Sequence, residues 1–197
     1  QALINAGLAG KPLVANFETH WNRDAAYYAN PWRGTWKGEQ GGAVLGHAVH
    51  VNDFLCTVFG PVARHSVFTR TRVNPIQTED CASISLQMES GALATSSITL
   101  GANDDTSRYR FVFENLTAES GLLPYAPASD GWTFSARGVT TQEQVLAVLR
   151  DVPPVRQGFE GYLEAFDDAI EGKLNRAVTF EDGRRSLELV TAIYQSA

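Results

Sequence analysis

Two histidines and an aspartate stand three residues apart in the stretch GGAVLGHAVHVND, residues 41–53. His47, His50 and Asp53 carry side chains that transfer protons or bind metal ions near neutral pH. A neutral imidazole can accept or donate a proton, and a carboxylate one helical turn away can orient it. The spacing therefore indicates either acid–base catalysis or a metal site on one helix.

A metal site is the less favoured hypothesis, and we predict no metal. At positions i, i+3 and i+6 the three side chains spread over roughly 120° of the helix surface, which is wide for one ion. The sequence indicates no fourth ligand. A purely structural interpretation also stays open, in which these side chains only satisfy polar atoms beneath a sheet.

A second group of candidates lies in the aromatic stretch WNRDAAYYANPWRGTWKGEQ, residues 21–40. Arg33 follows Trp32, and Tyr28 stands close by. A guanidinium among aromatic rings suits a sugar or an acid, because rings stack on sugar faces and the guanidinium fork bonds hydroxyls or carboxylates. An equally compatible interpretation is an arginine that pairs with an acid and packs on tryptophan within a surface loop.

One helix is predicted over residues 43–59, and it must carry both histidines. Its apolar residues recur at helical spacing, and they are Val44, Ala48, Val51, Leu55 and Val58. The opposite arc holds Gly46, His47, His50, Asp53 and Thr57. Gly60 and Pro61 end the helix. The histidines are therefore expected on the polar side of a mostly buried helix.

Alternation of apolar and polar residues predicts strands over 13–20, 80–88, 92–100 and 108–113, with a turn at 89–91. Short strands with one polar face predict a largely antiparallel sheet that is covered on one side. The first residues resemble the last turns of a helix that ends at Gly7 and Gly10. A capping box of Thr140 with Glu143 predicts a helix through Leu149.

Helices are also predicted over 159–170 and from about Asp182 to the end of the chain. Strands followed by helices, without regular βαβ alternation, predict an α+β fold with helices on one face of the sheet. No linker divides the chain, so residues 1–197 are expected to form one domain.

Composition excludes several partners. The net charge is −6 and no basic cluster occurs, which argues against nucleic acid and anionic membranes. No apolar stretch approaches the ~20 residues that span a bilayer. Two cysteines form no disulfide framework, so a reducing compartment, the cytoplasm, is expected. No G-x-S-x-G, P-loop or G-x-G-x-x-G motif is present.

Taken together, these stretches resemble the carboxy-terminal domain of the glucose–fructose oxidoreductase / inositol dehydrogenase / MocA family. The resemblance covers nearly the whole chain in the same element order. It runs through AGLAGKPL, WRGTWKGEQGGAVLGHAVHVNDFLCTVFGPV, TEDCASISLQMESGALATSSITL, GFEGYLEAFDDAIEGK and VTFEDGRRSLELVTAIYQSA. It implies an open, mostly antiparallel mixed sheet with helices on one face, like the C-terminal domain of glyceraldehyde-3-phosphate dehydrogenase-like oxidoreductases.

Members of this family are NAD(P)-dependent oxidoreductases that act mostly on sugars, polyols and their acids. The resemblance implies a longer protein that uses NAD or NADP, bound by a Rossmann domain that precedes these residues. The glycine fingerprint and the lysine of the family's Glu-Lys-Pro stretch are absent from this sequence. No cofactor-binding residue is therefore expected in the chain, which should be inactive by itself. A homo-oligomer through the second sheet face is also implied.

In the family's helix motif, His50 matches the His and Asp53 matches the later Asp. Gly46 stands where many members carry the catalytic Asp, and His47 beside it could serve instead. The resemblance thus implies that His50 and His47 are catalytic, with His50 bonding the reacting hydroxyl. The residues expected to bind substrate are Arg33, Tyr28, Trp32 and Asp53. Gly46 also keeps a second hypothesis open, a non-catalytic binding or oligomerisation module that kept the fold.

Overall fold

The computed structural model describes residues 1–125, 131–156, 158–173 and 175–197. Its central element is a mixed sheet of seven strands in the order β2-β3-β4-β1-β5-β6-β7. The strands are β1 Pro12–Asn22, β2 Val62–Arg70, β3 Cys81–Met88, β4 Leu93–Thr99, β5 Gly101–Phe113, β6 Leu116–Glu119 and β7 Thr133–Ala136. All neighbouring pairs are antiparallel except β1 and β4, which are parallel.

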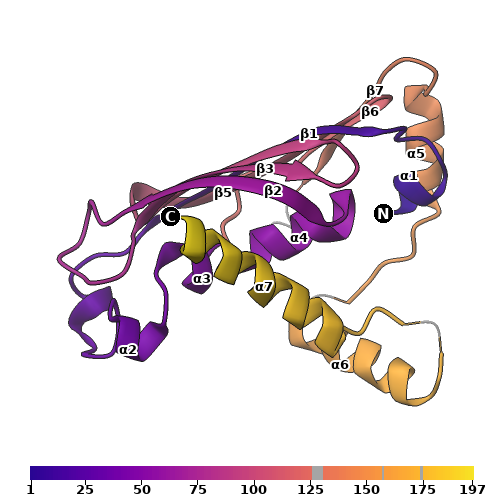
Figure 1. Cartoon of the computed structure of the whole chain (residues 1–197). Coiled ribbons are helices and arrows are strands. Elements are labelled where there is room, and N and C mark those ends of the chain that lie inside the picture. The colour runs from indigo at the N-terminus through magenta and orange to yellow at the C-terminus, as the bar shows by residue number, and fades with distance from the viewer. Residues whose placement is uncertain (126–130, 157, 174) are drawn as a thin grey trace.

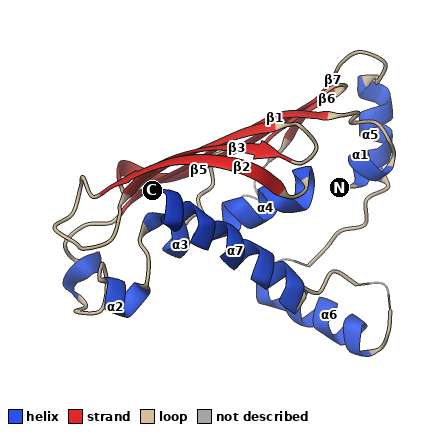
Figure 2. Ribbon diagram, viewed as in Figure 1, coloured by secondary structure: helices blue, strands red, loops and turns tan. Residues whose placement is uncertain are grey.

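Helices cover one face of this sheet (Figures 1 and 2). They are α1 Ala2–Asn5, α2 Trp36–Glu39, α3 Ala43–Gly46, α4 Val49–Phe59, α5 Gln142–Arg150, α6 Gly158–Ile170 and α7 Phe180–Ser196, with a 3-10 turn at Tyr27–Ala29. Helices α3, α4 and α7 lie under the sheet, whereas α1 and α5 lie beside its β6–β7 end. The expected α+β fold, an open mixed sheet with helices on one face, is confirmed.

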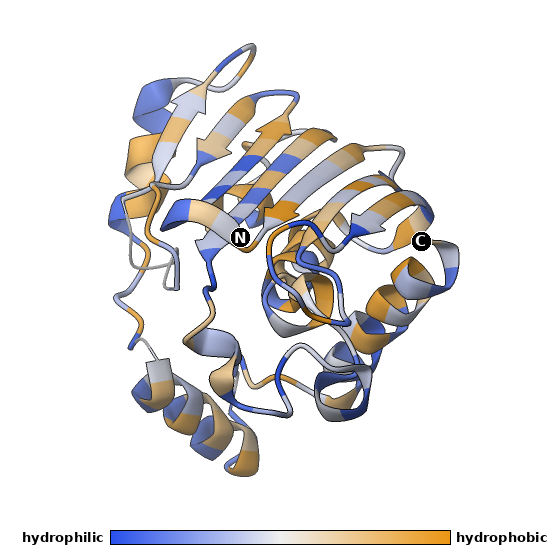
Figure 3. Cartoon of the chain, turned by 90° about the vertical axis from the view of Figure 1, so that its left-hand side faces the viewer, coloured by the Kyte–Doolittle hydropathy of each residue, from blue (hydrophilic) through white to orange (hydrophobic). Residues whose placement is uncertain are grey.

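The one-sided cover follows from the alternation along the strands, which Figure 3 shows as alternating hydrophobic and hydrophilic residues. On β3 the apolar set faces the helices and is buried, while the serines between are exposed. The buried residues of this strand are Ala82, Ile84, Leu86 and Met88. On β5 the rings of Tyr109, Phe111 and Phe113 are likewise buried. The predicted β3–β4 hairpin and the apolar face of β5 are therefore correct.

The helix predicted over 43–59 is wrong in its continuity. It breaks after α3, because His47 adopts φ −128° and ψ −46° and Ala48 begins the second helix as its N-cap. The apolar stripe survives the break, since Val44, Val51 and Leu55 are all buried. Because the break falls at His47, His47 and His50 are not related by ideal helical geometry.

Three further boundaries differ from the sequence prediction. The cap of α5 is Thr141 with Gln144, one residue later than predicted. Helix α7 begins at Phe180, because Thr179 and Asp182 form its capping box. Strand β5 begins at Gly101 rather than 108, since its first half pairs with the end of β1. Strands β2, β6 and β7 were not predicted, because their alternation is weak or they span only four residues.

Candidate functional site

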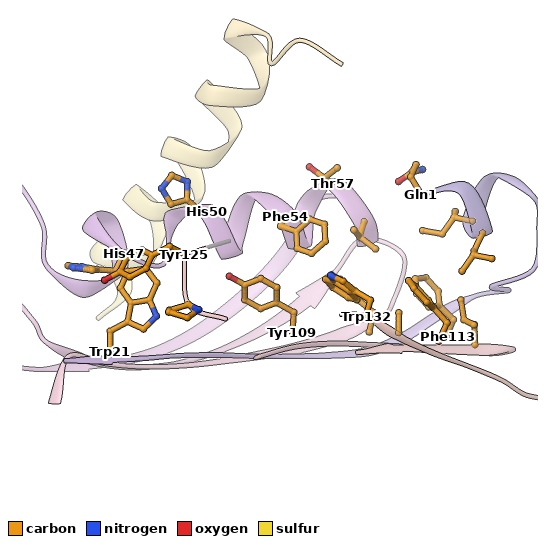
Figure 4. Close-up of a pocket in the computed structure, with 18 of the residues that line it drawn as sticks. Gln1, Trp21, His47, His50, Phe54, Thr57, Tyr109, Phe113, Tyr125 and Trp132 are labelled. Atoms are coloured by element: carbon orange, nitrogen blue, oxygen red, sulfur yellow. The ribbon is translucent and has the colours of Figure 1, made fainter. Parts of the chain in front are cut away.

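A cavity of about 760 Å³ lies between α4 and the sheet. In Figure 4, His50, Thr57 and Gln1 lie along the edge that faces away from the sheet, while Trp21, Tyr109 and Trp132 lie on the sheet side. One end of the cavity, called here the polar end, is lined by Trp21, Arg23, Gly46, His47, His50 and Tyr125. The remainder is aromatic, lined chiefly by Phe54, Tyr109, Phe111, Phe113, Trp132 and Phe134. Of the predicted site residues, the cavity brings together His47 and His50.

His47 forms part of the inner wall at the polar end. Its side chain is buried, and its ring meets the Trp21 ring edge to face at 5.4 Å between centroids. Its Nδ1 atom is buried and finds no hydrogen-bond partner among the described residues. Burial, reinforced by the charges of Arg23 and Arg33, lowers the pKa of His47 to about 4. The imidazole is therefore neutral at pH 7 and available as a hydrogen-bonding group.

Arg23 stands next to His47 in a charge-balanced cluster. Its Nη1 lies 3.1 Å from Oδ2 of Asp105, and its Nη2 donates to the Tyr125 hydroxyl at 2.5 Å. Tyr125 donates to the same carboxylate, and the Asn22 amide donates to its other oxygen at 2.6 Å. Burial raises the pKa of Asp105, but these hydrogen bonds outweigh it and lower the pKa overall. The cluster thus fixes a guanidinium and a phenol at the polar end.

The sequence missed Asp105 and Tyr125 as site residues. Both lie about eighty residues or more beyond Arg23. Asp105 is brought near by the pairing of β5 with β1, and Tyr125 follows β6, which pairs with β5. Trp21 and Arg23 lie within the aromatic stretch that was predicted to suit a sugar or an acid. Nothing in their spacing distinguishes them from Trp32 and Arg33. A pattern within one segment cannot reveal a partner that the sheet supplies.

The residues predicted around Arg33 form a separate cluster. The Arg33 guanidinium carbon lies 4.0 Å from the Tyr27 ring centroid and 4.6 Å from that of Trp32. It also bonds the Tyr27 hydroxyl and lies 3.5 Å from Glu39. These are the contacts of the alternative interpretation, an arginine packed on rings and paired with an acid. Neither Arg33 nor Trp32 is among the described residues that line the cavity.

Tyr28 belongs to the same cluster, since its ring meets the Tyr27 ring edge to face at 5.0 Å. Burial, reinforced by Tyr27 and Glu39, raises the pKa of Tyr28 to about 12, so its hydroxyl stays protonated. Tyr27 also lies 5.1 Å from the Arg23 guanidinium and 6.1 Å from the His47 ring. Tyr27 therefore connects the Arg33 cluster with the cavity wall.

Asp53 lies away from the cavity. Its Oδ1 accepts a hydrogen bond of 2.6 Å from the Ser186 hydroxyl, which ties α4 to α7. Its predicted role in substrate binding stays a prediction, whereas the structural role has an observed partner.

Gly46 opens directly onto the polar end. Apart from its chain neighbours and the helix backbone, no described heavy atom lies within 4 Å of a Cβ placed on Gly46. The backbone at this position therefore has room for the Cβ of a side chain. Within the described ranges, no three His, Cys, Asp or Glu side chains gather as a metal site. Nor is any described helix long and apolar enough to cross a membrane.

The fold is thus an open α+β sheet with helices on one face and a cavity between α4 and the sheet. The family model described as the GFO/IDH/MocA C-terminal domain matches residues 1–119, and the chain belongs to this family. The resemblance noted in the sequence is thereby confirmed. A comparison with curated proteins finds no match.

Solved structures resemble the whole chain. The WlbA dehydrogenase from Bordetella pertussis, solved with NADH and UDP-GlcNAcA, is 25% identical with a TM-score of 0.78, covering 99% of this chain and 55% of its own. WlbA from Chromobacterium violaceum, solved with the same two ligands, is 24% identical with a TM-score of 0.77, covering 99% of this chain and 55% of its own. An aldose-aldose oxidoreductase from Caulobacter crescentus, complexed with glycerol, shares the fold at 18% identity and a TM-score of 0.74, covering 99% and 56%. The chain thus spans little more than half the length of these relatives.

Proposed function

We propose that this chain is the substrate-binding domain of a longer NAD(P)-dependent oxidoreductase that acts on a CH–OH group of a sugar, polyol or sugar acid. The observation that carries the proposal is the convergence of His47, His50 and Gly46 on one cavity. These three residues occupy the helix motif in which the family holds its catalytic groups. The ligands of the WlbA structures, UDP-GlcNAcA and NADH, agree in chemistry with this substrate class.

In this proposal His50 hydrogen-bonds the reacting hydroxyl from the rim of the cavity and shares its proton. His47 stays neutral and bonds a second substrate oxygen, and its unpartnered Nδ1 fits such a role. Arg23 and Tyr125 orient the substrate at the polar end, with Trp21 as a stacking surface. When bound, the nicotinamide supplies the hydride acceptor. A lysine of the longer protein completes the hydroxyl's contacts.

Arg33, Tyr28, Trp32 and Asp53 keep their predicted substrate contacts only as a proposal. Arg33, Trp32 and Tyr28 lie near the cavity through Tyr27, because Tyr27 contacts both their cluster and the His47 ring. A shift of the loop at 24–40 would bring their polar groups toward the cavity. Asp53 has no such route, because its carboxylate faces Ser186.

We infer that a Rossmann domain of the same protein is the partner of this chain and holds the dinucleotide. Exposed apolar side chains on α6 and α7 support this inference, because large apolar patches on a protein surface are typical of sites that another domain or protein covers. They are Phe159, Tyr162, Leu163, Phe166, Ile170, Phe180 and Leu187. Without that domain, the chain should turn over no substrate.

The outer sheet face is the proposed homo-oligomer contact. It exposes Phe68, Leu93 and Val14 among serines, threonines and ordered polar pairs such as Asn16 with Thr95 at 2.8 Å. A preformed polar surface with a few apolar residues is suited to pairing with a second copy.

The free thiols of Cys56 and Cys81 agree with the proposed reducing, cytoplasmic location.

The deciding experiment compares His50→Ala with His65→Ala in the full-length protein. His65 is a suitable control, because it bonds the Ala192 carbonyl at 3.2 Å and does not line the cavity. We expect His50→Ala to lower nicotinamide-dependent turnover by a factor on the order of 10²–10⁴ while dinucleotide binding is retained. Full turnover in the His50 variant would remove the assignment.

The second candidate function is a binding or oligomerisation module without catalysis, which Gly46 favours because no carboxylate stands at that position. It predicts that the intact protein binds a sugar-like ligand yet gives no nicotinamide absorbance change with any sugar, polyol or sugar acid tested. Turnover of any such substrate would exclude it.

A further inference from the structure

A buried carboxylate lies behind the cavity wall and takes no part in the proposed chemistry. Glu79, in the loop between β2 and β3, is only 5% exposed. Its Oε1 accepts hydrogen bonds from the Val44 amide at 2.9 Å and the Tyr194 hydroxyl at 2.8 Å. Its Oε2 accepts from the Gly42 amide at 3.1 Å. Every one of these donors belongs to the start of α3 or to α7.

Glu79 and Tyr194 together satisfy the amides that open α3. The Ala43 amide donates to the Glu79 carbonyl at 2.9 Å, and the Leu45 amide donates to the Tyr194 hydroxyl at 3.3 Å. The first N–H groups of a helix have no partner within the helix and need one elsewhere. A side chain at the N-cap usually provides it. Here the N-cap is Gly42, so two residues distant in sequence replace that side chain.

This arrangement explains why two glycines precede the helix. A Cβ on Gly42 would lie 1.9 Å from the Glu79 carbonyl oxygen, and one on Gly41 would lie 2.6 Å from the Tyr194 hydroxyl. Any side chain at these positions would push Glu79 and Tyr194 away from the amides. The Gly-Gly pair is therefore a close-approach site for the capping groups.

The helix that they cap leads directly to His47. Only one turn separates Gly42 from His47, whose amide closes the helix by donating to the Ala43 carbonyl at 3.2 Å. A helix this short has no rigidity of its own. Its direction is therefore set by what holds its first turn. Helix α7 also holds α4 through Ser186 and Asp53, so both histidine-bearing segments are braced by one helix.

We propose that Glu79 and Tyr194 are positioning residues that orient α3 so that the His47 ring stays buried against Trp21 in the cavity wall. The catalytic meaning of this role rests on the proposed function, but the positioning itself does not. Burial raises the pKa of Tyr194, and the neighbouring Glu79 adds to it, so the hydroxyl stays protonated and can donate to Glu79 while it accepts from the amides.

The test measures how fast each histidine reacts with diethyl pyrocarbonate, by peptide mass spectrometry of the full-length protein. The variants are Tyr194→Phe, Glu79→Ala and Glu79→Gln. Asp80→Asn is the matched control, because Asp80 is equally buried but accepts from the amides of residues 72–74, at 2.7–2.9 Å, rather than from α3. His20, on the outer sheet face with Ser97 as partner, is the internal reference.

We expect His47 to react faster in Tyr194→Phe and Glu79→Ala by a factor on the order of ten, with the His20 rate unchanged. Glu79→Gln should fall between these variants and the wild type, since its oxygen still accepts from Val44 but its amide group opposes the Gly42 amide. Asp80→Asn should leave the His47 rate unchanged.

An unchanged His47 rate in Tyr194→Phe would overturn the proposal, and so would equal acceleration of His47 and His20. If Glu79→Ala does not fold, the milder Tyr194→Phe and Glu79→Gln variants decide the question. The measurement uses neither substrate nor cofactor. A failed catalytic assignment would therefore leave its result intact, and a failed positioning proposal would leave the catalytic assignment intact.

Discussion

The His47 imidazole meets the Trp21 indole edge to face, with 5.4 Å between ring centroids and 80° between ring planes. This contact joins the end of α3 to the end of β1, and the imidazole is buried there. Protonation of His47 would bury a cation beside Arg23, and the Asp105 carboxylate offsets this cost only in part. The folded cavity wall therefore favours the neutral form of His47.

This relationship predicts a loss of stability in mild acid. The pKa of His47 is about 4 in the folded protein against 6.5 in the unfolded chain, so between these values the unfolded state binds more protons. Stability must fall as the pH drops through this window. Between pH 7 and 5 we expect His47 to remove about 2 kcal/mol. Urea unfolding of wild type and His47→Gln at both pH values measures this loss. An equal change in unfolding free energy between the two pH values in both proteins would contradict the prediction.

A second prediction concerns the open position at Gly46. Gly46→Asp should fold with an unfolding free energy within about 1 kcal/mol of the wild type, because a Cβ there meets no described atom within 4 Å beyond its neighbours and the helix backbone, and glycine is a poor helix former. Gly42→Ala is the contrasting variant, since its Cβ would lie 1.9 Å from the Glu79 carbonyl oxygen. It should lose about 2 kcal/mol or more. Similar stabilities in denaturant unfolding would refute the packing argument.

Gly46→Asp also tests how the chain departs from its family. If the proposed dehydrogenase chemistry is weakened by the missing carboxylate, turnover in the full-length protein should rise in this variant. A drop in turnover with unchanged folding would mean that His47 has taken over the role and that the new carboxylate interferes with it.

A third prediction separates two roles for Asp53. If its bond to Ser186 is structural, Asp53→Ala and Ser186→Ala should each cost about 1 kcal/mol, and the double variant little more than either. Ligand affinity of the full-length protein should stay unchanged. Loss of ligand affinity in Asp53→Ala but not in Ser186→Ala would instead support the predicted substrate contact.

A fourth prediction concerns the apolar residues of α6. In the full-length protein, Phe166→Ser should lower the unfolding free energy by about 1.5–3 kcal/mol if this face is covered by another domain. Asp167→Ser, on the adjacent exposed position, should change it by no more than about 0.5 kcal/mol. Thermal or urea unfolding compares the two, and an equal, small effect of both variants would show that α6 stays exposed.

Much of the fold followed from local patterns. Alternation identified the β3–β4 hairpin and the buried rings of Tyr109 and Phe111, because the period of a strand is visible in any short segment. Helical spacing likewise identified α4 and α6. The family resemblance rested on the same segments, and the helix motif indicated His47 and His50, which do share one cavity.

Local sequence patterns alone define the type of each long element and which of its faces is apolar, since both depend on neighbours within a few residues. How those elements meet depends on contacts in the folded chain. The tertiary structure broke the helix at His47, and it brought Glu79 and Tyr194 from elsewhere in the chain to cap the first turn of α3. It brought Asp105 and Tyr125 to Arg23 through strand pairing, and it turned Asp53 toward Ser186. Contacts of this kind join residues far apart in the chain, and no local period records them.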